Sequence, residues 1–388
     1  MRHSPLAVVV TALAACNQPL QPPRDTAVPA SVVQTAASYA VIDLGAFSPT
    51  AINDGGAIAG QVWIGNDLHG VVWDDGTTQD LGRLGVAPPG SWVFPLAING
   101  RAQIVGNNSY GANHVRGFVW NKGVIQDLGD LVGGENDVPQ VVANGVSQSG
   151  LVVGQSDARP FGTHAFLWRN GLMTDLGTLG GFKSAAFGVN NRGQVAGWSL
   201  TSGRAQHAFE WNAGMMQDLG TIGGDQSIGL LINEAGQVAG VGATSAGESH
   251  AFVWSDGVMQ DIGAFTPVAI NDVGSVAGND GGHAFVWDNG VLTALGSLGG
   301  DWSSVAGMNN AGQIVGTSRT GSGEMHAFVW DQGVMSDLGA SADGAASSAV
   351  AISNSGAITG STRTTSGEIR ALLWQRAAPA TSVVVQRR

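Results

Sequence analysis

The chain has 388 residues, of which 12% are charged and 60 are glycine, and its formal net charge is −12. Charged residues are about half as frequent, and glycine about twice as frequent, as in an average globular protein. An acidic chain without a basic block argues against nucleic acid and anionic lipid as partners. After the N-terminus, no apolar run approaches the roughly 18 residues that a membrane-spanning helix needs.

The N-terminus has the pattern of an export signal. Arg2 precedes an apolar run over residues 6–15, which suits the core of a signal peptide but is too short to span a bilayer. The run ends in LAAC (13–16), which resembles a bacterial lipobox, where the chain is cleaved before a cysteine that then receives lipid. Cys16 is the only cysteine. A general secretory signal with a cysteine there by chance is the alternative.

These features predict the first and last segments of the chain. Residues 1–15 are expected to be a lipoprotein signal peptide, and residues 16–39 a lipidated Cys16 followed by a proline-rich, flexible tether. Asn17 after the cysteine, instead of aspartate, favours the outer membrane or cell surface over inner-membrane retention. Without a second cysteine, an exported fold must be stabilised by packing alone. Residues 377–388 are expected to be a disordered tail.

A repeat of about 43 residues fills the region from residue 40 to residue 376. Each copy has a tryptophan, a glycine that closes a short apolar run before it, and a DLG-like triplet after it. The repeated tryptophans are Trp73, Trp120, Trp168, Trp211, Trp254, Trp287, Trp330 and Trp374. The triplets that follow the best-matching copies begin at Asp175, Asp218, Asp261 and Asp337, and Ala294 replaces the aspartate in one copy.

Each copy contains four short strand-like runs. In residues 185–220 they are AAFGV (185–189), QVAGWSL (194–200), HAFEW (207–211) and MMQDLG (215–220). Short apolar runs bounded by glycine and asparagine indicate strands and hairpins, and no window has helical periodicity. Four strands in about 43 residues is the length of one propeller blade.

The turn after the tryptophan predicts a strand register. Asn170-Gly171 is typical of a type I′ turn, because both residues tolerate the positive φ that this turn requires. With this turn, Trp168 faces Met173 and Phe166 faces Asp175 on one side of the sheet. A lone sheet cannot cover such an aromatic face, so we expect the copies to stack, gaining about 1.5–3 kcal/mol per large apolar side chain.

The two ends of the repeat region predict closure of the stack. The last copy stops after Trp374 without a DLG strand, whereas residues 40–45 (AVIDLG) form such a strand with no tryptophan before it. The expected fold is therefore all-β, an eight-bladed β-propeller of four-stranded antiparallel blades closed by the N-terminal strand. An open β-repeat stack, a seven-bladed ring and blades that each begin at DLG are the alternatives.

The combination of HAF, a following tryptophan, DLG and LGG resembles the HAF repeat family of extracellular bacterial proteins over roughly residues 41–374. The first, second and last copies depart from it, with HGVVW (69–73), RGFVW (116–120) and RALLW (370–374). The resemblance implies an exported repeat protein and transfers no catalytic motif. The histidines of the matching copies are His164, His207, His250, His283 and His326.

The repeated histidine and aspartate suggest either a metal site or a structural pair. Arg116 and Arg370 replace the histidine in two copies, and arginine cannot ligate a metal. We therefore expect pairs within each blade, with His283 the least constrained because Ala294 lacks a carboxylate. No EF-hand loop, phosphate-binding fingerprint or nucleophile elbow is present, so no catalytic residue, metal or cofactor is predicted.

Four tryptophans outside the repeated column are the candidate ligand-binding residues: Trp63, Trp92, Trp198 and Trp302. Trp92 lies in an inserted segment, APPGSWVFP, and Trp302 is expected between strands. An exposed tryptophan on a rigid scaffold can stack on a sugar or anchor a protein partner. Local packing beneath a long loop is the alternative.

The sequence thus predicts a monomeric, non-enzymatic lipoprotein of the cell envelope or surface, held on the membrane by its lipid anchor. It would bind a protein or glycan through loops at one rim. An extracellular carbohydrate-active propeller enzyme and a purely structural envelope protein are the alternatives.

Overall fold

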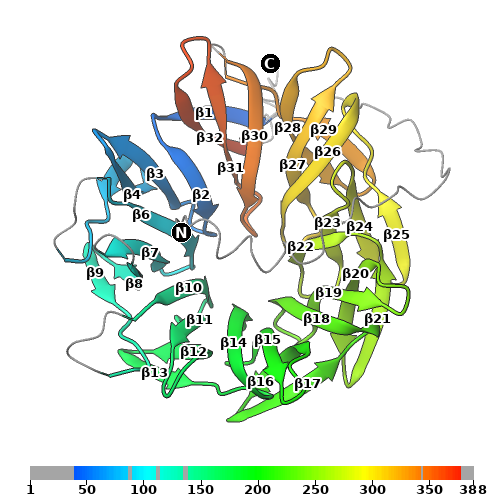
Figure 1. Cartoon of the computed structure of the whole chain (residues 1–388). Coiled ribbons are helices and arrows are strands. Elements are labelled where there is room, and N and C mark those ends of the chain that lie inside the picture. Colours follow the sequence, from blue (N-terminus) through cyan, green and yellow to red (C-terminus); the bar gives the residue numbers. More distant parts are fainter. Residues whose placement is uncertain (1–38, 86–89, 111–113, 134–138, 342–343, 377–388) are drawn as a thin grey trace, which may run out of the picture.

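The computed structural model describes residues 39–85, 90–110, 114–133, 139–341 and 344–376. The predicted signal peptide, Cys16, nearly all of the tether and residues 377–388 lie outside these ranges. The described chain forms strands arranged in antiparallel sheets that stand around a common axis in chain order (Figure 1). The fold is all-β and propeller-like. Nowhere in the described ranges does a helix reach the length and apolar character needed to cross a membrane.

The strands group into four-stranded units, which we number 1 to 8 in chain order. Unit 1 contains β2 (Ser48–Ile52), β3 (Ile58–Ile64), β4 (Asp67–Asp74) and β5 (Thr77–Asp80). Unit 2 contains β6 (Val93–Ile98), β7 (Ile104–Tyr110), β8 (His114–Asn121) and β9 (Val124–Asp127). Unit 3 contains β10 (Val141–Val146), β11 (Val152–Asp157), β12 (Thr163–Arg169) and β13 (Leu172–Asp175). Unit 4 contains β14 (Gly180–Val189), β15 (Val195–Thr201), β16 (Gln206–Asn212) and β17 (Met215–Gly220).

The second half of the chain repeats this order. Unit 5 contains β18 (Gly223–Ile232), β19 (Val238–Thr244), β20 (Ser249–Ser255) and β21 (Val258–Gly263). Unit 6 contains β22 (Thr266–Ile270), β23 (Val276–Asn279), β24 (Ala284–Asp288) and β25 (Val291–Ala294). Unit 7 contains β26 (Gly299–Met308), β27 (Ile314–Thr320), β28 (Met325–Asp331) and β29 (Val334–Asp337). Units 3 and 4 are joined into one sheet by a single parallel pair, Thr163 with Lys183.

Unit 8 combines strands from both ends of the repeat region. Its order is β1 (Tyr39–Gly45), β32 (Ile369–Arg376), β31 (Ile358–Thr364) and β30 (Gly344–Ile352). Strand β1 runs antiparallel to β32, with Val41 opposite Trp374. It begins at Tyr39, one residue before the predicted boundary, because the pairing continues to Arg376.

The predicted turn and register are present. Asn170 and Gly171 have φ of 51° and 89°, as a type I′ turn requires. Trp168 lies opposite Met173 and Phe166 opposite Asp175. The predicted alternation of side chains therefore holds across this hairpin.

The core lies between neighbouring units. One cluster joins Val153 and Leu176 of unit 3 to Val195 and Phe209 of unit 4, and all four are buried. Within each unit, the recurring glycine of the second strand permits a close approach of the neighbouring strands. At Gly154 an added Cβ would overlap the carbonyl oxygen of Val142, so a side chain there would push the innermost strand away.

The innermost strands differ from the prediction in length and shape. Strand β14 begins at Gly180 instead of residue 185, because Gly180 pairs with Thr201 beyond an irregular stretch. Strand β26 likewise begins at Gly299, so Trp302 lies inside a strand and not between strands as predicted. A pair of glycines usually indicates a loop in a sequence. At the starts of β14 and β26, however, the glycine pair forms strand because the second strand of the same unit pairs with it.

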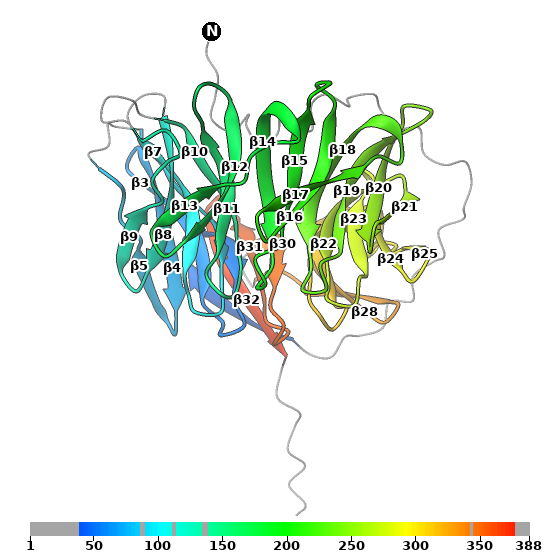
Figure 2. The ribbon, with the colours of Figure 1, turned by 90° about the horizontal axis from the view of Figure 1, so that it is seen from below.

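The strands run between two faces of the molecule, which Figure 2 shows from the side. We call one the turn face, because it carries the tight turns between the first and second and between the third and fourth strands. The opposite loop face carries the connections between the second and third strands and from each unit to the next. This alternation follows from the antiparallel order of each unit.

Hydrogen bonds link the inner turns of neighbouring units on the turn face. The Asn190 side-chain amide donates to the carbonyl of Asn233 at 3.1 Å, and Asn233 donates to Asn271 at 2.9 Å. A different contact joins the turns of units 8 and 1, where the backbone N–H of Asn354 donates to the Asp54 carboxylate at 2.7 Å. The Asn-x-x-Gly pattern thus connects units as well as shaping turns.

Candidate functional site

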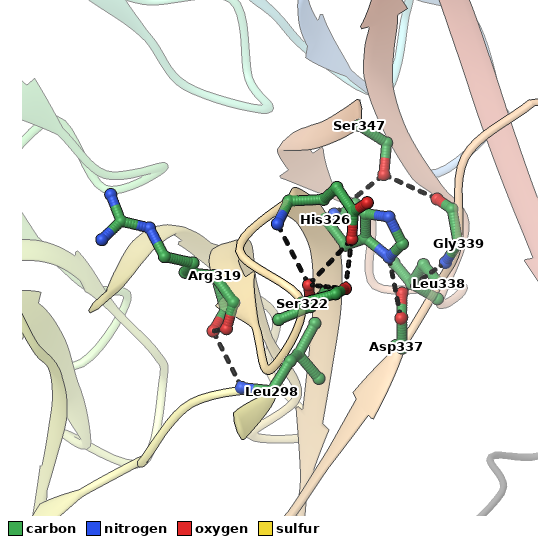
Figure 3. A network of polar contacts seen from close by, with 12 residues as sticks. Leu298, Arg319, Ser322, His326, Asp337, Leu338, Gly339 and Ser347 are labelled. Carbon is green, nitrogen blue, oxygen red and sulfur yellow. Dashed lines mark hydrogen bonds and ion pairs between the residues drawn. The ribbon is translucent and has the colours of Figure 1, made fainter. Parts of the chain in front are cut away.

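The repeated histidine and aspartate form pairs at the loop face, as Figure 3 shows for unit 7. His326 Nδ1 lies 2.8 Å from an Asp337 oxygen, and the other oxygen accepts the Gly339 N–H at 2.7 Å. Ser347 of unit 8 accepts the Ala327 N–H and donates to the Gly339 carbonyl. The HAF and DLG motifs therefore meet in one network that also contacts the next unit.

The same pair occurs in most other units. The Nδ1–carboxylate distances are 2.6 Å for His69–Asp80, 2.9 Å for His164–Asp175, 2.9 Å for His207–Asp218 and 2.8 Å for His250–Asp261. Arginine takes the place of histidine in Arg116–Asp127 at 2.9 Å and Arg370–Asp43 at 2.7 Å. Each aspartate also caps the backbone of its own DLG turn, which accounts for the triplet.

His283 is the exception. Its side chain is 50% exposed, against 19–22% for the five paired histidines, and it contacts Asp280 of its own loop at 3.5 Å. Ala294 offers no carboxylate at the usual position. Within the described ranges, no three His, Cys, Asp or Glu side chains gather as a metal site would require.

The four candidate tryptophans lie in three separate regions. Trp63, on β3, has 68% of its side chain exposed, whereas Trp92, Trp198 and Trp302 are half-buried. Trp198 lies on β15 of unit 4 and Trp302 on β26 of unit 7. Only Trp63 and Trp92 come together, at the boundary between units 1 and 2.

Trp63 and Trp92 flank Leu68 in one row of backbone pairs. Trp63 is the antiparallel partner of Leu68, and Leu68 forms a parallel bridge with Trp92. Directly paired residues project from the same side of a sheet. Trp63 and Leu68 therefore share one side of the unit-1 sheet, and the bridge places Trp92 of unit 2 next to Leu68. We call these three residues the apolar row, and Trp63 is the most exposed of them.

A charged network fixes the loop beside this row. Arg83 donates to Asp67 at 3.3 Å and to His69 Nε2 at 3.0 Å. Because arginine only donates, His69 Nε2 accepts, so its Nδ1 carries the proton that is donated to Asp80. The other Asp67 oxygen accepts the N–H groups of Gly90 and Ser91, at 2.8 and 3.2 Å. We call Trp63, Leu68 and Trp92, with Asp67 and Arg83, the unit-1 corner.

The electrostatics of the corner favour a charged Asp67. The hydrogen bond from Gly90 lowers the pKa of the Asp67 carboxyl, partial burial opposes it, and Arg83 and Ser91 lower it further. The carboxylate therefore remains ionised at neutral pH and holds the start of β6 against unit 1. An apolar row bordered by fixed charges can contact a ligand that has both an apolar face and polar groups.

Sequence reasoning identified both tryptophans but missed Asp67 and Arg83. A signal existed, since Arg83 occupies the place after DLG that Thr178 and Thr221 hold in units 4 and 5. Those threonines close a local turn, as Thr178 does by donating to the Gly181 carbonyl at 2.9 Å. The substitution by arginine marks a departure from the repeat.

No model of a protein family and no curated protein matches the chain. Solved structures with a similar fold include dipeptidyl peptidase 4 of Porphyromonas gingivalis. That enzyme is 10% identical, the match covers 86% of this chain and 58% of that one, and the TM-score is 0.53.

Two further structures resemble the chain less closely. The β-propeller domain of the trilobed protease from Pyrococcus furiosus is 10% identical, with 77% of this chain and 99% of that one covered and a TM-score of 0.48. A puromycin-hydrolyzing peptidase of Mycobacterium tuberculosis is 13% identical, with 79% and 56% covered and a TM-score of 0.47. The chain thus spans under three fifths of the two whole peptidases. At these identities the likeness concerns the fold alone.

Proposed function

We propose that the protein is a non-enzymatic lipoprotein of the cell envelope or surface that binds a glycan through the unit-1 corner. In this proposal, Cys16 carries the lipid anchor, the repeats are HAF repeats, and the eight units form the blades of a closed propeller. The observation that carries the binding function is Trp63, a large apolar residue that is 68% exposed in the row that it forms with Leu68 and Trp92.

Contacts between unit 8 and unit 1 support the closed ring. Asn354 binds Asp54, and the buried cluster around Phe47 and Val71 includes Ala371 and Leu373 of the last strand. Strand β1 occupies the place of the fourth strand in unit 8. A rigid ring keeps the unit-1 corner in one geometry, which lowers the entropic cost of binding.

The chemistry of the corner supports a glycan. Sugar rings present an apolar face that stacks on indole, and their hydroxyl groups bind charged and amide groups at the edge. Trp63 and Trp92 offer such faces, and Asp67 and Arg83 supply fixed polar groups beside them. A protein partner anchored on Trp63 is the other class that this corner fits.

The enzyme alternative has less support. Carboxylates gathered near the axis would favour it, and Asp54, Glu234 and Asp272 do lie at the inner turns. Each, however, accepts a backbone N–H from a neighbouring unit, at 2.7–3.2 Å. These bonds give the three carboxylates a structural role in joining the turns.

A glycan array followed by calorimetry tests the proposal. Wild type is expected to bind a subset of glycans, and Trp63→Ala to lose at least about tenfold in affinity, since an anchoring aromatic contributes 2 kcal/mol or more. Phe161→Ala is the matched control, because Phe161 is 67% exposed in unit 3. Glycan binding that survives Trp63→Ala would contradict the assignment. If the protein binds a protein partner and no glycan, the glycan proposal is wrong and the corner is a protein-binding site.

A further inference from the structure

A second pattern-breaking residue lies on the turn face, far from the unit-1 corner. The residue before each repeated tryptophan is valine or leucine in seven units and packs toward the next unit. In unit 4 it is Glu210, whose side chain is only 7% exposed. A buried carboxylate costs free energy unless a partner compensates its charge.

Within the described chain, only one of the two carboxylate oxygens of Glu210 has a hydrogen-bond partner. Gln194 Nε2 donates to Glu210 Oε1 at 2.7 Å. Among the described residues, no hydrogen bond reaches the second oxygen, Oε2. A neutral amide leaves the charge uncompensated, so one oxygen of Glu210 has the capacity to accept a donor from outside the chain.

Glu210 lines a groove of about 480 Å³ between units 4 and 5, whose wall extends to Asp272 and Val273 of unit 6. Asp256 and Asp272 also line it, together with Trp254, and the described residues of its wall include no lysine or arginine. Ser255 and Asn310 donate hydrogen bonds to Asp256 and Asp272, and both donors are neutral. The groove is therefore an acidic recess next to an aromatic ring.

The boundary between units 7 and 8 shows how the same fold satisfies such an acid. Gln313 stands at the position of Gln194 and donates to Asp331 at 2.9 Å. Asp331 is the residue after Trp330, whereas Glu210 is the residue before Trp211, so the two acids reach the glutamine from different positions of the third strand. Arg376 of unit 8 donates to the same Asp331 oxygen at 2.9 Å. Arg376 lies two residues after Trp374, which is the position that Asp256 holds after Trp254. At this position unit 8 therefore has the guanidinium of Arg376, whereas unit 5 has the carboxylate of Asp256.

We propose that the groove between units 4 and 5 binds a guanidinium group, carried by a free ligand or by an arginine side chain of a partner protein. Glu210 Oε2 accepts from it in the way that Asp331 accepts from Arg376, and Asp256 adds a second negative charge. Trp254 forms part of the wall but is only 7% exposed, so the two carboxylates supply the recognition of the cation. This site is independent of the proposed glycan site, because it lies on the opposite face and shares no residue with it.

Calorimetry with arginine amide and the peptide GGRGG, each against its citrulline counterpart, tests the proposal on the full chain. The arginine probes are expected to bind, with affinity falling as salt rises. Glu210→Val places the residue of five other units at this position, so the fold is expected to persist while affinity falls about tenfold or more. Glu210→Gln serves if the valine variant is insoluble.

Asp256→Asn keeps the type I′ turn, as Asn170 shows, and is expected to weaken binding about threefold. Asp75→Asn makes the same change at the same turn of unit 1 and is expected to leave binding unaltered. Equal affinity of peptide and amide identifies a small ligand, whereas preference for the peptide identifies a protein partner. Binding of the citrulline probes, no binding of either arginine probe, or unchanged affinity in Glu210→Val would overturn the site.

Discussion

Ala294→Asp tests the repeated pair at the one unit that lacks it. In unit 6 the rest of the triplet is intact, since Leu295 is 4% exposed and Gly296 has a φ of 79°. His283 is present but half exposed, and it lies 3.5 Å from Asp280. A carboxylate at position 294 would therefore complete the motif without moving the backbone.

The magnitude follows from the two contacts that the carboxylate gains. In the other units one oxygen accepts the N–H of the DLG glycine at 2.7–2.9 Å, a bond worth about 0.5–1.5 kcal/mol. The partly exposed pair with histidine adds about 0.3–1 kcal/mol. Together they predict a gain of about 0.8–2.5 kcal/mol, or a rise in Tm of about 1–3.5 °C for a folded region of this size.

Scanning calorimetry measures this gain in stability. Two further variants separate the contribution of the hydrogen bond to the glycine from that of the pair with His283. Ala294→Asn supplies the turn cap without the charge, so it is expected to give only the first part. In a His283→Ala background, Ala294→Asp is expected to give only the stabilisation from the hydrogen bond to the glycine, because the pair with histidine cannot form. If Ala294→Asp leaves Tm unchanged or lowers it, the pair is not a stabilising element of the repeat.

Three further predictions address the packing, the corner and the anchor. Gly154→Ala is expected to cost about 2–4 kcal/mol in chemical unfolding, because its Cβ overlaps the Val142 carbonyl, and a cost below about 1 kcal/mol would refute the close approach. The folded-state pKa of Asp67 lies below its ordinary value, so its stabilisation is present above about pH 4 and lost as pH falls through that lowered pKa. The protection factor of the Gly90 amide, which corrects for the intrinsic pH dependence of hydrogen exchange, should therefore fall at acid pH, and Asp67→Asn should reproduce this fall at pH 7; an unchanged protection factor in both cases would contradict this role of Asp67. Cys16→Ala is expected to release the protein from membranes, and unchanged membrane pelleting would exclude lipidation there.

The repeated features of the fold were predictable, because each arises from local chemistry that recurs. The Asn170-Gly171 turn requires positive φ, and that turn alone places Phe166 and Trp168 on one face. The deeper reason for the DLG triplet was not predictable, because it depends on Asp337 binding its own glycine and His326 at once. This double contact involves two strands, β28 and β29, and depends on how they pair in space.

Both candidate sites lie where the repeat is broken, and the sequence analysis identified part of the unit-1 corner but not the groove between units 4 and 5. Trp63 and Trp92 were visible as tryptophans outside the column, but their common neighbour Leu68 depends on a bridge between two units. Trp302 is also a tryptophan outside the repeated column, but it lies on β26 in unit 7, away from the other two, where its glycine-rich stretch pairs as a strand. The sequence analysis did not single out Glu210, although it is the one acid at a position that is valine or leucine in the other seven units, and its burial against Gln194 required the packed structure.

Closure of the ring by the N-terminal strand is the claim on which the account depends, and a disulfide tests it directly. Ala40 and Gln375 are exposed cross-strand partners, and paired strands hold Cα atoms at about 4.5–5.5 Å, within reach of a disulfide. In a Cys16→Ala background, Ala40→Cys with Gln375→Cys is expected to oxidise within one chain and raise the unfolding temperature. Ala40→Cys with Gln217→Cys, an exposed site on β17, is the control and should not cross-link. Failure of the first pair to form an intramolecular disulfide, or equal cross-linking of the second, would contradict closure.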